Sequence, residues 1–301
     1  MSKILQFKDL KEMIDSRAKE LEFVKYLKQF RNKTIVIKYG GSALETAKQI
    51  SFLVNDLIFL KQQNLHVILI HGGSRQLNGV LKSNDIKIEA INGIRVTTKE
   101  VLSYAIKVFK DVNNYIVDEI NKKGKGEIKA IGLNGHEIPI TVSDFLDRGK
   151  YQYVGKIKKV NIEYLTALGK EYIPVLSSLS QTGDNQPLNV NADIKAAEIA
   201  KAIKAEKFII MTDTEGILDK NKTLISSIDS HKIEQLIQQK IISEGMVPKV
   251  EACLSALKGG VKKVHIINGT QAHSLVREIF TDEGVGTQIM ESYEVKKETH
   301  A

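Results

Sequence analysis

The stretch TIVIKYGGSAL, residues 34–44, contains the unit from which the fold is built. An apolar, β-branched run is followed by a lysine, a glycine pair and the start of a helix. Apolar residues on both faces are typical of a strand that is buried in a parallel sheet. A charged side chain, Lys38, stands where this strand ends, and it marks the strand end as a candidate functional site.

The alternation of strand and helix continues along the chain. Six short apolar runs predict buried strands at 34–39, 66–70, 127–133, 171–176, 207–212 and 263–268. Periodic stretches between them predict helices at 45–63, 98–121, 192–204 and 246–258. This order predicts an α/β protein with a mostly parallel central sheet that carries helices on both faces. The stretch 135–160 alternates in polarity and contains turn residues, which predicts hairpins at the sheet edge.

A further helix is predicted ahead of the first strand, over residues 8–30. Its apolar residues recur at helical spacing, which makes the helix amphipathic; they are Leu10, Met13, Ile14, Leu21, Val24 and Leu27. Two interpretations stay open. The helix packs on its own domain, or it is an arm that docks on another subunit.

The composition limits the class of protein. The chain has 301 residues and one cysteine, Cys253, which excludes an intrachain disulfide framework and suits a reducing compartment. Charges run through the N-terminal segment, so no signal peptide is predicted. No apolar run approaches the roughly 18 residues of a membrane-spanning helix. We therefore expect a cytoplasmic protein without a membrane partner.

The net charge of +8 is compatible with nucleic-acid binding, but the residue types argue against it. The chain has 38 scattered lysines, only 6 arginines and no tryptophan. Base readout and base stacking favour arginine and aromatic side chains. We therefore expect a solvated, lysine-rich surface and no nucleic-acid partner.

Glycine pairs follow two of the predicted strands, at Gly40–Gly41 and at Gly72–Gly73. The carboxyl ends of parallel strands are where ligands bind in open α/β sheets. Glycine amides near helix starts make a nest for phosphate or oxyanion groups. A plain tight turn explains either pair alone, but two pairs and one lysine favour an anion site.

Two later segments place polar side chains at helix starts. In LNVNADIKAAEIA, residues 188–200, Asn189, Asn191 and Asp193 precede a helix, although capping needs only one of them. In SEGMVPKVEACLSAL, residues 243–257, Lys249 lies in a first helical turn, where a cation opposes the helix dipole. A bound anion explains this lysine, and a harmless exposed lysine is the alternative. The P-loop, Rossmann, HExxH and Cys/His metal motifs are all absent from the sequence.

Six segments occur in this order: VIKYGGSAL, LIHGGSRQLN, INGIRVTT, LNVNADIKAAEIA, MTDTEGIL and SEGMVPKVEACLSAL. Together they resemble the motifs of the amino acid kinase family, in the branch that phosphorylates N-acetyl-L-glutamate. The resemblance implies an open α/β/α sandwich of two lobes. An N-lobe at 31–190 would bind N-acetylglutamate and mediate dimerisation, and a C-lobe at 191–301 would bind ATP. Residues 1–30 would form an interlacing N-terminal helix.

The reaction implied by the resemblance uses ATP and Mg²⁺ to convert N-acetyl-L-glutamate into N-acetyl-L-glutamyl 5-phosphate, the second step of arginine biosynthesis. The nucleophile is a carboxylate with a pKa of about 4.3, so it needs no general base at neutral pH. The protein has to neutralise charge and hold two anions in line.

The resemblance also assigns roles to residues. Lys38 and Lys249 would stabilise the transferring phosphoryl group and the ATP phosphates, and Asp193 would hold both lysines. Substrate binding falls to amides and side chains of Gly41, Gly72, Gly73, Arg95 and Asn189. Nucleotide binding falls to Gly40, Thr212, Asp213, Gly216, Ile217, Leu218, Gly245 and Met246. No metal site made of protein side chains is expected.

Three positions depart from the family pattern: Ser74 and Arg75 replace the third glycine and a proline, and His136 stands where lysine is expected. These changes concern the choice of substrate. N-acetyl-L-aminoadipate kinase, another amino acid kinase or a catalytically silent arginine sensor therefore remain as alternatives.

The two ends of the chain resemble the arginine-sensitive members of the family, in which N-terminal helices interlace three dimers into a hexamer. The resemblance implies inhibition by L-arginine, a homo-oligomer (dimer or hexamer) and an arginine site that contains Tyr26, His273, Glu278 and Gly284. The alternative is that 272–280 is simply a terminal amphipathic helix.

Overall fold

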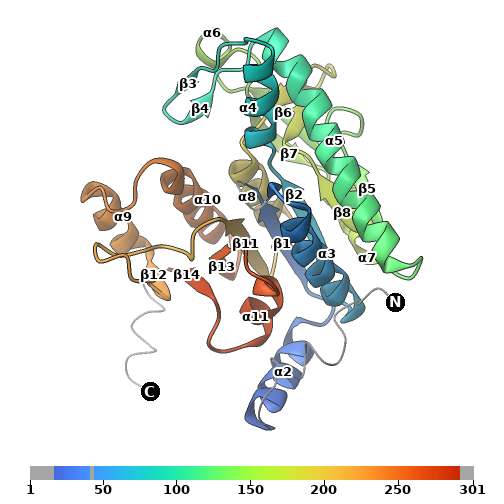
Figure 1. The fold of residues 1–301 in the computed structure, drawn as a ribbon, viewed down its shortest axis with the longest axis vertical. Coiled ribbons are helices and arrows are strands. Elements are labelled where there is room, and N and C mark those ends of the chain that lie inside the picture. Colours follow the sequence, from blue (N-terminus) through green and yellow to red (C-terminus); the bar gives the residue numbers. More distant parts are fainter. Residues whose placement is uncertain (1–16, 41–43, 292–301) are drawn as a thin grey trace.

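The computed structural model describes residues 17–40 and 44–291. Its main feature is an eight-stranded sheet with the order β12-β14-β13-β11-β1-β2-β8-β5, which is covered by helices on both faces (Figure 1). Three layers of this kind bury the apolar faces of both helices and strands.

The six predicted strands are the six neighbouring strands in the middle and at one edge of this sheet. They are β13 (Lys263–Asn268), β11 (Lys207–Thr212), β1 (Thr34–Tyr39), β2 (His66–His71), β8 (Ile173–Leu176) and β5 (Ala130–Leu133). All their pairings are parallel, which confirms the prediction. Two short strands that the sequence patterns did not predict complete the sheet: β14 (Gly286–Met290), antiparallel to β13, and β12 (Ser227–Asp229).

Helices cover the sheet in two groups, each with its own apolar cluster. On one face lie α2 (Arg17–Phe30), α3 (Ala47–Gln62), α5 (Lys99–Gly124) and α11 (Ser274–Phe280). On the other face lie α7 (Ile162–Glu171), α8 (Ala192–Ala202), α9 (Ser230–Gln238) and α10 (Val247–Lys258). The four helices predicted after the first strand are thereby confirmed as α3, α5, α8 and α10.

The two-residue period of β1 decides which way its charged residue points. Ile35 and Ile37 pack in the cluster under α3, whereas Val36 packs in the cluster under α8 and α10. Lys38 has the same parity as Val36, so its side chain leaves the strand on the α8 and α10 face.

The hairpin predicted within 135–160 exists, but the prediction that it extends the main sheet is wrong. β6 (Thr141–Phe145) and β7 (Gly155–Val160), joined through α6 (Arg148–Tyr151), belong to a separate sheet with β9 (Leu179–Gln181) and β10 (Pro187–Asn189). Buried hydroxyl groups connect the two halves of this sheet, since Ser143 Oγ donates to Ser180 Oγ at 2.8 Å. The pairing joins segments far apart in the chain, which a local pattern does not reveal.

Shorter elements complete the upper part of the molecule in Figure 1. They are α4 (Ser74–Ser83) and the hairpin of β3 (Ala90–Ile91) and β4 (Ile94–Arg95). A 3₁₀ turn, η2 (Glu244–Met246), leads into α10.

Helix α2 confirms the second half of the predicted N-terminal helix, and residues 8–16 lie outside the described residues. Phe23 packs on Phe280, with ring centroids 4.9 Å apart, so the helix does contact its own domain. Leu21 and Val24 nevertheless remain 66% and 44% exposed. Within the described part of the chain, no helix is both long and apolar enough to cross a membrane.

Candidate active site

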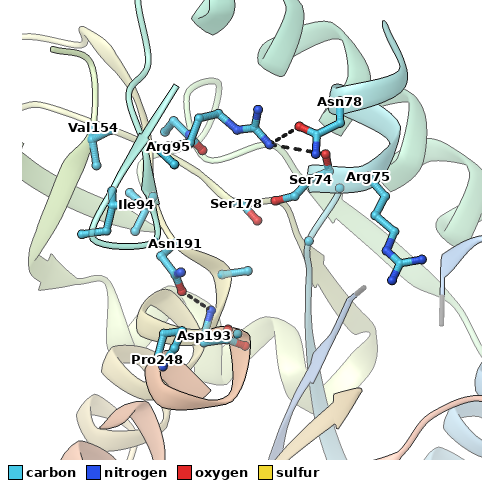
Figure 2. Close-up of a pocket in the computed structure, with 18 of the residues that line it drawn as sticks. Ser74, Arg75, Asn78, Ile94, Arg95, Val154, Ser178, Asn191, Asp193 and Pro248 are labelled. Atoms are coloured by element: carbon cyan, nitrogen blue, oxygen red, sulfur yellow. Dashed lines mark hydrogen bonds between the residues drawn. The ribbon is translucent and has the colours of Figure 1, made fainter. Parts of the chain in front are cut away.

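A pocket of about 460 Å³ opens at the carboxyl ends of β1 and β2. The loop after β2, the β3–β4 hairpin and the starts of α8 and α10 surround it (Figure 2). Eight of the predicted site residues line this pocket: Lys38, Gly72, Gly73, Arg95, Asn189, Asp193, Gly245 and Lys249. Segments from both predicted lobes therefore meet at one cavity.

Two lysines share one buried aspartate at the floor of the pocket. Lys38 Nζ lies 2.8 Å from Asp193 Oδ1, and Lys249 Nζ lies 3.7 Å from Asp193 Oδ2. We call these three residues the pocket triad. They come from β1, α8 and α10, so the fold brings together side chains that are far apart in the sequence.

The charges of the pocket triad do not balance. Burial alone would raise the pKa of Asp193, but the Lys38 and Lys249 ammonium groups outweigh burial and hold this pKa below its ordinary value. Burial lowers the pKa of Lys249, and the attraction of Asp193 opposes that shift. Two lysines against one carboxylate leave a surplus positive charge facing the cavity, which favours an anionic ligand.

In the segment that carries Asp193, one residue caps the helix and another contacts the two lysines. Asn191 caps α8, because its Oδ1 accepts from the amides of Asp193 at 2.8 Å and Ile194 at 3.1 Å, and the first of these bonds is drawn in Figure 2. The Asp193 carboxylate is thereby left for the lysines. Lys249 Nζ also donates to the carbonyl of Gly245 at 3.0 Å, so a lysine near a helix start is held by specific partners.

The glycines at the strand ends differ in what they offer a ligand. The Gly72 N–H donates to the Tyr39 carbonyl at 2.8 Å, so this amide is bonded within the protein, and its role as a donor to the ligand stays a prediction. A side chain at Gly73 would put its Cβ 2.7 Å from the Phe109 ring, and one at Gly40 would meet Lys38 Nζ at 2.8 Å. Gly41 lies outside the described residues.

Arg95 is a cation without a carboxylate partner among the described residues. Its Nη2 donates to Asn78 Oδ1 at 2.6 Å and to the Ser74 carbonyl at 3.4 Å, as Figure 2 shows. Its Nη1 is buried and has no partner within the described residues. Burial lowers the pKa of Arg95, but a guanidinium stays charged at neutral pH. This end of the pocket is therefore prepared for a second anion.

Asn78 and Ser178 line the pocket, although neither was singled out from the sequence. A signal for Asn78 exists in the sequence, because it lies one helical turn after Ser74 and so faces the same side of α4. Asn189, which was predicted, donates to Thr97 Oγ1 at 3.0 Å.

Most of the predicted nucleotide residues lie outside the pocket lining. Thr212 ends β11 next to β1, and Asp213 Oδ2 accepts from Arg75 Nη2 at 3.2 Å. Arg75 also pairs with Glu45. The Gly216, Ile217 and Leu218 segment packs against β14, where the Ile217 amide donates to Thr287 Oγ1 at 2.8 Å. The remaining member, Met246, is half-buried in η2.

The predicted arginine residues fall into two places. Tyr26, Glu278 and Gly284 share one corner of the molecule: Tyr26 donates to Asp282, and a Cβ at Gly284 would lie 3.1 Å from Glu278 Oε2. His273 instead lies 2.9 Å from Asp56 Oδ1, at the start of α11.

Two residues that the prediction omitted are in contact with Glu278. His265 Nδ1 lies 2.5 Å from Glu278 Oε1, and Lys207 Nζ donates to the Glu278 carbonyl at 3.3 Å. We call Lys207, His265 and Glu278 the corner cluster. Burial lowers the pKa of His265 and keeps the ring neutral, while contacts with His265, Val285 and Lys207 outweigh burial and lower the pKa of Glu278. The sequence did contain a signal for both residues, because Lys207 and His265 are basic side chains within apolar strand segments, at 207–212 and 263–268.

Residues 33–268 match the sequence model of the amino acid kinase family. The acetylglutamate kinase of Campylobacter hominis is 38% identical over 270 residues, which cover 89% of this chain and 94% of that protein. The acetylglutamate kinase of Aquifex aeolicus is 38% identical over 295 residues and covers 93% of this chain and 99% of its own. That of Carboxydothermus hydrogenoformans is 40% identical over 287 residues, covering 89% and 96%.

Solved structures share the fold. N-acetylglutamate synthase from Neisseria gonorrhoeae superposes with a TM-score of 0.82 at 23% identity, over 91% of this chain but only 63% of that longer chain. Carbamate kinase from Giardia lamblia superposes with a TM-score of 0.65 at 14% identity, over 87% of this chain and 99% of its own. These likenesses confirm the predicted α/β/α architecture.

Proposed function

The chain belongs to the amino acid kinase family and is an enzyme, and we propose that it transfers the γ-phosphoryl group of ATP to the side-chain carboxylate of N-acetyl-L-glutamate. Three relatives named acetylglutamate kinase, 38–40% identical over most of the chain, support this substrate. The observation that carries the proposal is the pocket triad, which presents surplus positive charge to a cavity with a second cation, Arg95, at its other end.

The proposed chemistry needs no proton transfer to start. The acceptor carboxylate is ionised at neutral pH, so it attacks the γ-phosphorus directly and ADP leaves. Lys38 and Lys249 stabilise the charge that spreads over the phosphoryl oxygens, and Asp193 keeps the two ammonium groups a fixed distance apart. Catalysis then consists of positioning and electrostatic stabilisation.

Arg95 is proposed to bind the α-carboxylate of the substrate. Asn78 and the Ser74 carbonyl hold one nitrogen of its guanidinium, and the buried Nη1 has no protein partner among the described residues. A planar guanidinium that is held in this way suits a carboxylate. Asn189, which donates to Thr97, also lines the pocket and is proposed to contact the same end of the substrate.

Mg²⁺ is proposed to arrive on the ATP phosphates, where it neutralises part of their charge. Both oxygens of Asp193 already contact ammonium groups, so the donor set of the pocket suits a metal that is held through phosphate oxygens. The described residues contain no group of three or more His, Cys, Asp or Glu side chains that would hold a metal ion.

The proposed function is tested by incubating the enzyme with Mg-ATP and, in parallel, N-acetyl-L-glutamate, N-acetyl-L-aminoadipate, glutamate and aspartate, with hydroxylamine to trap acyl phosphate. We expect hydroxamate from N-acetyl-L-glutamate, with a kcat/KM higher than for the other three. Hydroxamate mainly from the longer N-acetyl-L-aminoadipate would identify that compound as the substrate instead. No hydroxamate from any of the four would contradict kinase activity.

Feedback inhibition by L-arginine is a second part of the proposal and rests on the corner cluster. The Glu278 carboxylate is buried, and its near partners are the neutral His265 ring and the Val285 amide at 2.9 Å. A buried carboxylate that is served by neutral donors suits a guanidinium ligand. The exposed Leu21 and Val24 of α2, next to this corner, support a homo-oligomer, either a dimer or a hexamer.

The regulatory proposal predicts that L-arginine lowers the rate of hydroxamate formation in the wild type. A Glu278→Gln variant should keep its kcat but lose arginine inhibition, and light scattering should report the oligomer of both proteins. Unchanged inhibition in the variant would contradict the assignment of this corner as the arginine site.

A further inference from the structure

We propose that His71 is a positioning residue for phosphoryl transfer: by holding one neutral tautomer, it turns the Gly72–Gly73 peptide so that the Gly73 N–H faces the phosphoryl site. The proposal deepens the function proposed above and rests on it. It starts from a buried group of hydrogen bonds behind the pocket, formed by His71, Gly72 and Asn113 with the Val175 carbonyl.

The hydrogen bonds determine where the imidazole proton lies. His71 Nδ1 is 2.7 Å from the Gly72 carbonyl oxygen. A carbonyl oxygen only accepts, so Nδ1 must carry the proton and donate. At the other side of the ring, Asn113 Nδ2 lies 3.0 Å from His71 Nε2 and donates to the Val175 carbonyl at 2.9 Å. The Val175 carbonyl fixes the orientation of the Asn113 amide, so Nε2 is the acceptor.

The surroundings keep this tautomer in place. His71 and Asn113 are fully buried, and a Cβ at Gly132 would lie 2.3 Å from Asn113 Oδ1, so only a glycine leaves room for the Asn113 amide. Burial lowers the pKa of His71 to about 4, with a further contribution from the nearby Lys195, so the ring stays neutral at working pH. Ser178 Oγ donates to the His71 carbonyl at 2.8 Å and fixes the backbone as well.

The direction of the Gly72 carbonyl determines the direction of the next amide. In a trans peptide the C=O and N–H groups point in opposite directions, and the described residues contain no cis peptide. His71 continues the side of β2 that carries Val67 and Leu69, which packs toward α3 and α5. The carbonyl that meets the His71 ring therefore points to that face, and the Gly73 N–H points to the opposite face, where the pocket triad lies.

Of the two glycine amides in this loop, only that of Gly73 is available to donate to a ligand within the described residues. The Gly72 N–H is bonded to the Tyr39 carbonyl, whereas no hydrogen bond within the described residues uses the Gly73 N–H. Gly73 lines the pocket and stands at the N-cap of α4, where the helix dipole adds to the attraction for an anion. An amide that donates to the phosphoryl oxygens acts mainly in the transition state, so its orientation affects kcat more than substrate KM.

Two variants of His71 separate this role from a packing role. The amide nitrogen of asparagine overlays the Nδ1 position of histidine and retains a donor to the Gly72 carbonyl, whereas glutamine places its amide at the Nε2 position. We expect kcat to fall by about tenfold in His71→Asn, where one bond is lost. In His71→Gln it should fall by about 10²-fold, as for the loss of an oxyanion donor. The KM values for both substrates should stay within about threefold of wild type.

An NMR measurement on the wild-type protein tests the tautomer without relying on activity. The protein contains 7 histidines, and ¹⁵N labelling with a His71 variant as the difference control assigns the ring. We expect a protonated Nδ1 and an unprotonated Nε2 throughout the range of about pH 5.5 to 8.5, because the pKa of the ring lies near 4. A protonated Nε2 overturns the proposal.

The outcomes distinguish this proposal from the function on which it rests. A wild type that phosphorylates none of the carboxylate substrates overturns the proposed function. An active wild type in which His71→Asn and His71→Gln lose kcat equally, or raise KM instead, overturns the role of His71 alone.

Discussion

The pocket triad and the corner cluster each contain one buried carboxylate and basic side chains from other elements, yet their charge balances differ. In the pocket triad, Lys38 and Lys249 both contact the carboxylate of Asp193. In the corner cluster, Lys207 donates to a backbone carbonyl and lies 4.9 Å from the Phe30 ring, and the Glu278 carboxylate contacts a neutral histidine.

This difference indicates which kind of ligand each region accepts. Surplus positive charge at a cavity attracts anions, and the pocket triad faces the cavity together with Arg95. A buried carboxylate without a cation on its own oxygens attracts a cationic group instead. This contrast supports the two proposals, an anionic substrate in the pocket and a guanidinium effector at the corner cluster.

The largest effect should follow from removing a cation of the pocket triad. Lys38→Met should lower kcat by about 10³-fold, because it removes a charge that acts on the transferring phosphoryl group. Hydroxamate formation under saturating substrates measures this change. Lys61→Met is the matched control, since its ammonium donates to the Gly169 carbonyl at 2.7 Å, remote from the pocket, and kcat should not change. A Lys38→Met enzyme that retains a tenth of wild-type kcat would contradict the catalytic role proposed for the pocket triad.

The two carboxylates should differ in what their loss does to stability. Asp193→Asn leaves two lysines facing each other in a buried site, so the free energy of unfolding should fall by about 3 kcal/mol. Glu278→Gln leaves no unpaired like charges, and the loss should be about 1–2 kcal/mol.

Urea unfolding followed by circular dichroism measures both, because the chain has no tryptophan. Inorganic pyrophosphate should restore part of the stability of Asp193→Asn and none of that of Glu278→Gln. Equal losses with no effect of pyrophosphate would break the distinction between the two regions.

A smaller effect is expected at the second cation of the pocket. Arg95→Gln should raise the KM for N-acetyl-L-glutamate by about 30-fold with little change in kcat, since a charge-assisted bond is lost in ground and transition state alike. Asn78→Ala, which frees the guanidinium, should raise this KM by about fivefold. A fall in kcat without a change in KM would instead place Arg95 with the phosphoryl group.

The smallest effect is the pH dependence that Lys207 contributes to stability. Burial lowers its pKa to about 8, whereas an unfolded lysine titrates near 10.4. Between these values the unfolded chain binds more protons, so stability should rise with pH, by at most about 1.4 kcal/mol per unit. The difference in unfolding free energy between wild type and Lys207→Met should follow this slope from about pH 8 to 10. A flat difference would contradict the lowered pKa of Lys207 in the folded protein.

Much of the sheet was predictable because buried parallel strands carry their signal locally. Apolar, β-branched runs between helical stretches are sufficient to identify β1, β2, β8, β11 and β13. The edge strand β12 has three residues, and the hairpin of β6 and β7 pairs with β9, from a distant segment. Such pairings depend on contacts between remote parts of the chain. Local patterns therefore missed β12 and assigned the hairpin of β6 and β7 to the wrong sheet.

The candidate site divides in the same way. The residue types that carry charge were identified from the sequence because Lys38, Asp193 and Lys249 stand at strand ends and helix starts. The availability of each group was not identified: Gly72 was predicted to donate its amide to a ligand, and Tyr39 occupies that amide. His273 was predicted at the arginine site, whereas it is His265 that contacts Glu278. The arginine role of His273 stays a prediction.

The sequence by itself determined the central strands, the main helices and the chemical groups of this protein, because strand periodicity, helix capping and strand-end glycines are properties of neighbouring residues. Only the tertiary structure decided which groups meet and which are free. Ion pairs and hydrogen bonds such as Lys38 with Asp193, or Asn113 with His71, join residues far apart in the chain. Their distance and direction, and hence the charge and the open amide that the pocket offers, exist only once the layers have packed.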